Sequence, residues 1–110
     1  MARVVAFIPD LLFGSNVVGA LQAAGHEVKL TAAPDADGDV LVVDLTADVP
    51  ERIEAARTVI GPSIKSLAFY SHVESDVRAA ATAAGFDLVV PRSRMAREGP
   101  ALVERLVADE

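Results

Sequence analysis

Small polar or charged side chains follow four short apolar segments of the sequence. They are Asp10 after residues 4–8, Asp44 after 40–43, Ser71 and His72 after 67–70, and Arg92 and Arg94 after 88–90. If the four segments are parallel strands, their carboxyl ends meet at one edge of a sheet. Open α/β sheets bind their ligands at that edge. The sequence therefore predicts one binding site that all four segments share.

Two carboxylates in this set could bind a cation. Asp10 and Asp44 could hold Mg²⁺ weakly, with water completing its coordination shell, and we expect no other cofactor. Each residue also has a simpler role open to it. Asp10 could cap a helix or shape a turn, and Asp44 could accept hydrogen bonds from backbone groups at its strand end.

The other members of the set could bind a small anion or a nucleotide. Ser15 and Ser71 lie at expected helix N-termini, whose free N–H groups attract anions, and Arg92 and Arg94 could complete such a site. His72, in the first turn after Ser71, is either a ligand contact or a neutral, partly exposed side chain. Neighbours on a helix do not face each other, so Ser71 and His72 form no nucleophile–base pair, and no catalytic residue is predicted. No G-x-G-x-x-G or P-loop motif occurs, which disfavours a conventional dinucleotide or ATP site.

Alternating strand and helix patterns must position these side chains. Strands are expected at residues 3–8, 26–31, 40–44, 65–70 and 87–90, and helices at 15–24, 48–60, 71–84 and 100–108. Segment 26–31 alternates polar and apolar residues, as an edge strand does, whereas segment 40–44 is apolar enough to be central. This order predicts a three-layer α/β fold around an open, mostly parallel five-stranded sheet.

Capping residues set the expected helix boundaries. Ser15 and Asp48 are expected N-caps, and Ser71 to Glu74 form an S-x-x-E capping box. The last helix is expected from about Pro100 to Ala108.

No helix is expected between the second and third strands. Residues 32–38 are too few and too rich in turn-forming types to form one. An extended crossover is favoured over a hairpin at Asp37 and Gly38, because strand 40–44 is expected to be buried. Without that helix, we expect apolar sheet to be bare on one face, where a partner protein or a second copy could cover it.

Composition narrows the functional classes. The chain of 110 residues predicts one domain, and its net charge of −6 disfavours nucleic acid as a partner. There are no cysteines, which excludes disulfides and thiolate metal sites. No apolar stretch is long enough to span a membrane and no signal-peptide pattern occurs, so a cytoplasmic location is expected.

Several motifs resemble those of the response-regulator receiver domain, a CheY-like, flavodoxin-like fold. The segment Asp39 to Leu45 resembles the strand that carries the phosphoacceptor aspartate, here Asp44. Residues 67–71 resemble the strand that ends in a serine or threonine sensing phosphorylation, and residues 83–91 resemble the segment around the last strand. The resemblance implies strand order 2-1-3-4-5 over residues 1–110. Residues 10–15, 69–73 and 91–94 also resemble a group of bacterial receiver-like proteins, a likeness that implies no activity.

The sequence departs from the receiver pattern at two places. Receivers place two adjacent acids after the first strand, whereas here Pro9 precedes the single acid Asp10. Receivers also place a lysine after the last strand, where this chain has Arg92 and Arg94. We therefore expect a non-enzymatic signalling module, a pseudo-receiver that works without phosphorylation by docking a protein partner or as a homodimer. The alternatives are small-anion or nucleotide binding at the strand ends, and a stand-alone receiver phosphorylated at Asp44.

Overall fold

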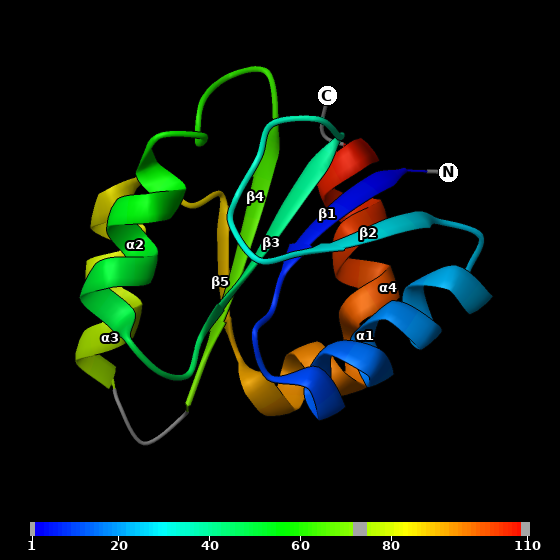
Figure 1. Cartoon of the computed structure of the whole chain (residues 1–110), viewed down its shortest axis with the longest axis horizontal. Coiled ribbons are helices and arrows are strands. Elements are labelled where there is room, and N and C mark those ends of the chain that lie inside the picture. The colour runs from blue at the N-terminus through cyan, green and yellow to red at the C-terminus, as the bar shows by residue number, and fades with distance from the viewer. Residues whose placement is uncertain (1, 72–74, 109–110) are drawn as a thin grey trace.

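The computed structural model, which describes residues 2–71 and 75–108, confirms the α/β architecture. Strands and helices follow one another along the chain (Figure 1). The elements are β1 (Arg3–Phe7), α1 (Leu11–Ala23), β2 (Glu27–Thr31), β3 (Val40–Leu45), α2 (Val49–Arg57), β4 (Lys65–Tyr70), α3 (Ser75–Ala84), β5 (Leu88–Pro91) and α4 (Arg92–Ala108). No helix within residues 2–71 and 75–108 is long and apolar enough to cross a membrane.

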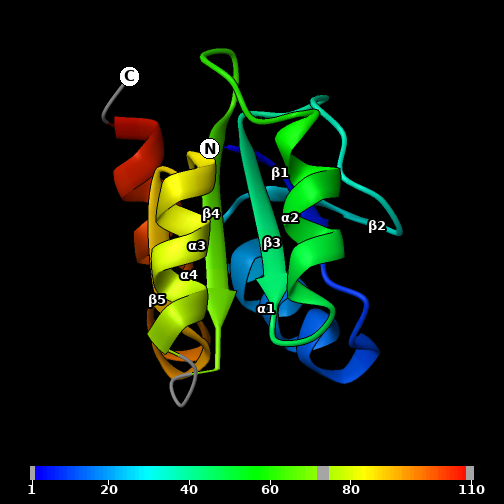
Figure 2. The ribbon, with the colours of Figure 1, turned by 90° about the vertical axis from the view of Figure 1, so that its left-hand side faces the viewer.

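The five strands form one sheet in the order β2-β1-β3-β4-β5, and every neighbouring pair is parallel. The predicted strand order and the extended crossover between β2 and β3 are therefore confirmed, and the hairpin alternative is wrong. Helices α1 and α4 cover one face of the sheet, and α2 and α3 cover the other (Figures 1 and 2).

Side chains that alternate along the strands form a hydrophobic core on each face. On the α1 and α4 face, Val42 of β3 packs in one cluster with Leu21 and Val103. On the α2 and α3 face, its neighbour Val43 packs in a second cluster with Ala56 and Ala81. All six residues of β3 are buried, which confirms the central strand that the apolar segment 40–44 predicted.

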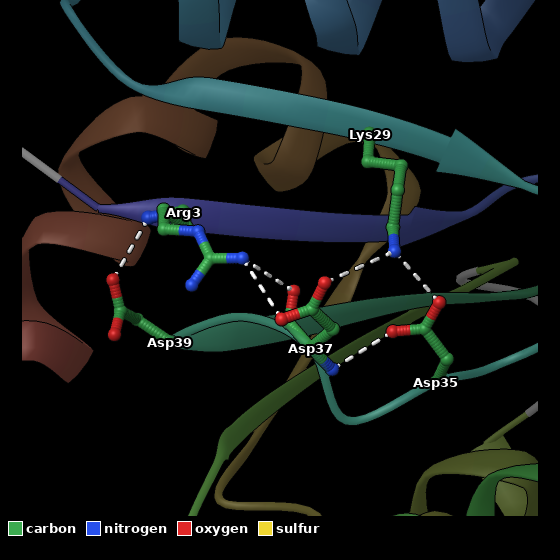
Figure 3. A network of polar contacts seen from close by, with 5 residues as sticks. All are labelled: Arg3, Lys29, Asp35, Asp37 and Asp39. Carbon is green, nitrogen blue, oxygen red and sulfur yellow. Dashed lines mark hydrogen bonds and ion pairs between the residues drawn. The ribbon is translucent and has the colours of Figure 1, made fainter.

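Residues 32–39 cover part of the sheet face from which a helix is missing, and charged groups hold them there (Figure 3). Arg3 of β1 lies 2.9 Å from a carboxylate oxygen of Asp37, and Lys29 of β2 lies 2.8 Å from one of Asp35. The backbone N–H of Arg3 donates to the Asp39 carboxylate at 2.9 Å. The side-chain hydrogen bond from Lys29, followed by a backbone one from Asp37, lowers the pKa of Asp35.

The expectation of a bare apolar face is wrong. Val5 of β1 is only 1% exposed. A Cβ atom on Gly38 would lie 2.9 Å from the carbonyl oxygen of Arg3 and 3.0 Å from a methyl group of Val5, so the segment packs directly on β1. Beyond β1, the side chains that β2 presents on this face are polar, because Glu27 and Lys29 alternate with apolar neighbours.

Two predicted helix starts differ from those in the structure, and one predicted N-cap makes no capping hydrogen bond. Helix α1 begins at Leu11 and is capped by Asp10, so Ser15 is not an N-cap but an exposed residue within the helix. Helix α4 begins at Arg92 and contains Pro100, because buried Met95, Gly99 and Leu102 already follow a helical spacing before and beyond the proline. Asp48 precedes α2 as predicted, but its side chain makes no capping hydrogen bond.

The predicted capping box at Ser71 to Glu74 lies partly outside the described residues, which exclude His72, Val73 and Glu74. Helix α3, described from Ser75, ends before Gly85 as predicted, and Gly85 has the positive φ of 105° that favours glycine after a helix.

Candidate functional site

In Figure 2, β3 and β4 run downward and their carboxyl ends lie side by side at the lower edge of the sheet. Asp44 lies near the end of β3 and is paired in register with Phe69 of β4. Asp10 follows β1, Ser71 follows β4, and Arg92 follows β5. The parallel sheet thus brings the predicted strand endings to one edge, as the sequence predicted.

Asp44 is buried, and groups of the protein contact both of its carboxylate oxygens. Its residue is 1% exposed. Oδ1 accepts a hydrogen bond from the backbone N–H of Thr46 at 2.8 Å and another from the Thr46 hydroxyl. Oδ2 lies 3.3 Å from the guanidinium of Arg52. The backbone hydrogen bonding that the sequence left open as the simpler role of Asp44 is therefore present.

Arg52 reaches Asp44 because the chain reverses between β3 and α2. Asp48 adopts the left-handed conformation, with φ 49° and ψ 44°, which aspartate tolerates better than most residues. The backbone carbonyl of Asp48 then accepts from the N–H of Arg52 at 2.9 Å and starts the helix. One guanidinium nitrogen of Arg52 also donates to the backbone oxygen of Asp44 at 3.0 Å. The Arg52 side chain is only 13% exposed, so the ion pair is largely shielded from water.

Asp10 has a local role of its own at the start of α1. Its Oδ1 accepts the N–H of Phe13 at 3.1 Å, the capping interaction that the sequence left open. Its Oδ2 lies 3.9 Å from the guanidinium of Arg92 at the start of α4. Asp10 therefore links the N-termini of two helices that follow different strands.

Phe13 gives Arg92 a platform. The guanidinium carbon of Arg92 lies 4.6 Å from the centre of the Phe13 ring, a cation–π geometry. The same ring packs on Phe69, with ring centres 5.0 Å apart. A hollow of about 400 Å³ opens beside this stack, lined by Phe13, Ser71, Arg92, Ser93 and Ala96. Ser71 and Arg92, which follow different strands, therefore line the same hollow.

Other predicted site residues lie apart from this hollow or outside the description. The guanidinium of Arg94 lies 3.6 Å from Glu98 on its own helix. Ser15 is exposed on α1, one turn beyond the N-terminus, so the anion-binding role expected of a helix start does not apply to it. His72 lies outside the described residues.

The two carboxylates fit a divalent cation poorly. Thr46 and Arg52 contact the oxygens of Asp44, while Phe13 and Arg92 contact those of Asp10. Within residues 2–71 and 75–108, no group of three or more histidine, cysteine, aspartate or glutamate side chains could hold a metal ion. A guanidinium group stands close to each acid instead.

Arg52 and Thr46 are not among the site residues that the sequence predicted. Thr46 carries a recognisable signal, because an aspartate often accepts the N–H two residues further on in an Asx-turn. Arg52 carries no such signal, since an arginine in the first turns of a helix is usually a solvent-exposed residue. Phe13 is both buried and in contact with Arg92.

Comparisons with known proteins support the fold. No protein-family model matches the sequence, and no curated protein matches it. A response regulator from Thermotoga maritima is similar with a TM-score of 0.78 and 16% identity, over 96% of this chain and 97% of that one. A response regulator receiver protein from Burkholderia phymatum gives 0.81 and 18%, over 98% and 96%. NtrX from Brucella abortus gives 0.82 and 15%, over 98% of this chain but 26% of that one, so there the fold is part of a longer protein.

The chain therefore has the fold of CheY-like receiver domains, as the resemblance implied. At these identities the likeness concerns the fold, and the chemistry of the site must be argued from its own residues.

Proposed function

We propose that this chain is an interaction module on the receiver fold that works without phosphorylation of Asp44 and catalyses no reaction. It acts by binding another protein or a second copy of itself. The observation that carries the proposal is the contact between Arg52 and the buried Asp44.

Phosphoryl transfer to an aspartate requires a free carboxylate oxygen as the nucleophile. It also requires cations that neutralise the charge developing on the phosphoryl group. Here a hydrogen bond to Thr46 and the Arg52 guanidinium hold the carboxylate of Asp44. A guanidinium is always charged, and its planar donors pair well with carboxylate oxygens. Arg52 therefore keeps a permanent positive charge beside the carboxylate of Asp44.

Incubation with acetyl phosphate and Mg²⁺, followed by intact-mass measurement, tests this proposal. The mass of the wild-type protein is expected to stay unchanged. Addition of one phosphoryl group to the wild type, but not to Asp44→Asn, would contradict the proposal and support the alternative of a stand-alone receiver. Ser71→Ala is a matched control, because it alters the same edge of the sheet and leaves Asp44 in place.

A second candidate function is binding of a small anion or nucleotide at the same edge. The hollow beside Arg92 favours it, because Phe13 supports the guanidinium while 48% of the Arg92 side chain stays exposed. Ser71 and Ser93 add hydroxyl groups to the lining of that hollow. An arginine fixed on an aromatic ring and flanked by hydroxyl donors suits phosphate oxygens.

Thermal unfolding with inorganic phosphate, nucleotides or Mg²⁺ tests this second candidate. A ligand that binds the folded chain raises the melting temperature. The rise should disappear in Arg92→Ala and persist in Arg97→Ala, since Arg97 lies further along α4 and contacts Glu98 instead. Unchanged melting with every one of these additions would rule the candidate out.

A further inference from the structure

Strand β2 forms one edge of the sheet and pairs only with β1 among the described strands. Figure 1 looks onto the outer side of β2, and no other described element crosses in front of it. Glu27, Lys29 and Leu30 are exposed along this strand. An open edge of this kind offers backbone N–H and C=O groups to another strand.

Only alternate residues of β2 direct these groups outward. The N–H of Glu27 donates to the carbonyl oxygen of Ala2 at 3.0 Å, on the β1 side. In a parallel pair, the residues that bond to one neighbour alternate with those that face away from it. Val28 and Leu30 therefore present their N–H and C=O groups to the outer side.

We propose that β2 pairs with β2 of a second copy of this chain, antiparallel, about a two-fold axis at Val28. Outward-facing residues must oppose each other in such a ladder, so the axis passes through a residue of β2 and not between two residues. An axis at Glu27 or Lys29 places two like charges opposite each other, which is unfavourable. An axis at Leu30 places Lys29 opposite Thr31 and brings no opposite charges together.

The axis at Val28 makes the charges of β2 complementary. Glu27 then lies opposite Lys29 of the partner, and by symmetry the pair occurs twice. These residues are opposed at positions without backbone hydrogen bonds, where side chains approach most closely. Lys29, which lies 2.8 Å from Asp35 in its own chain, has three donors and can contact the partner's Glu27 as well.

The same register provides a place for an exposed apolar side chain. Leu30 is 42% exposed. With the axis at Val28 it lies opposite His26 of the partner, beside a hollow of about 470 Å³ that Val4 and Val28 line together with polar and charged side chains. Covering Leu30 there removes apolar surface from water and adds to the backbone hydrogen bonds.

Light scattering of the wild-type protein and charge variants over a range of concentrations tests the dimer. The wild type is expected to dimerise, and Glu27→Lys and Lys29→Glu should each weaken the dimer at least about tenfold, because like charges then oppose each other. An equimolar mixture of the two variants should form a heterodimer, since one carries only positive and the other only negative groups at these positions. Glu54→Lys, the same charge change on exposed α2, should dimerise as the wild type does.

Val28→Pro is a second variant that leaves the charges of β2 unchanged. It removes an outward N–H, which an edge strand tolerates, and should give a folded monomer. A wild type that stays monomeric at every concentration would overturn the proposal. So would a dimer that survives Val28→Pro, or a mixture of charge variants that stays monomeric.

The second copy is the partner of the proposed interaction module, and in naming it the dimer rests on the proposed function. The acetyl phosphate experiment tests Asp44, whereas light scattering tests β2. Either result can therefore fail while the other holds.

Discussion

The guanidinium of Arg52 lies 3.3 Å from a carboxylate oxygen of Asp44, and both side chains are largely buried. The contact joins the end of the central strand to the first turns of α2 across a loop of three residues. Burying two charges costs free energy, which their attraction offsets only while both partners remain. The buried carboxylate of Asp44 therefore depends for its stabilisation on Arg52, eight positions further along the chain.

Removing Arg52 should destabilise the protein strongly. Arg52→Ala leaves the buried carboxylate of Asp44 without its cation, which we expect to lower the free energy of unfolding by about 3–5 kcal/mol. Urea unfolding measures this change. The loss should be smaller when Asp44→Asn is already present, with a coupling of at least about 1 kcal/mol between the two substitutions.

Arg57→Ala is the matched control in the same helix. Arg57 lies 3.8 Å from Glu54, and both side chains are more than half exposed, so its removal should cost no more than about 1 kcal/mol. Additive effects of Asp44→Asn and Arg52→Ala, or equal effects of Arg52→Ala and Arg57→Ala, would contradict the role assigned to the buried pair.

Gly38 should tolerate no side chain. A Cβ atom there would lie 2.9 Å from the backbone oxygen of Arg3, which cannot move without disturbing β1. We expect Gly38→Ala to lower the free energy of unfolding by about 1–3 kcal/mol. In Gly61→Ala, where a new Cβ would meet no heavy atom beyond its chain neighbours within 4 Å, the change should stay within about 1 kcal/mol. Equal stability of the two variants would show that residues 32–39 do not pack on β1 as described.

The contact between Lys29 and Asp35 should weaken in acid. The side-chain hydrogen bond from Lys29 lowers the pKa of Asp35 in the folded protein, while the unfolded value is about 3.9. The stabilising contribution of Asp35 is therefore complete above that unfolded value and is lost as the pH falls through the lower folded pKa. Because Lys29 has a raised pKa, it remains charged throughout this range.

Carbon NMR of the Asp35 carboxyl group during an acid titration measures this pKa directly. Lys29→Met should raise it, because the largest cause of the shift is then absent. A midpoint for Asp35 that is the same in the wild type and in Lys29→Met would contradict the assignment.

Most of the fold could be predicted because the strands carry strong local patterns. Residues 40–43 are apolar without interruption and lie in the fully buried β3, which also settled the choice of a crossover over a hairpin. The start of α4 was missed because Pro100 resembles a first-turn residue. The helical spacing of Met95, Gly99 and Leu102 extends across it.

The candidate site could be predicted in position but only partly in its contacts. Asp10 and Asp44 had local roles open to them that depend on residues two or three positions away, and the structure contains these local hydrogen bonds. The contact with Arg52 depends on the left-handed conformation of Asp48 and on how α2 packs against β3. Neither property follows from the spacing of residue types along the chain.

The protein's own groups, Thr46 and Arg52, contact both carboxylate oxygens of Asp44. The backbone amide of Thr46, which donates to Asp44 at 2.8 Å, reports most directly on that carboxylate. Nitrogen–proton correlation NMR during a titration with Mg²⁺ should leave the Thr46 signal where it is, because Arg52 and Thr46 already satisfy both oxygens. A saturable shift of that signal in the wild type, absent in Asp44→Asn, would contradict the claim.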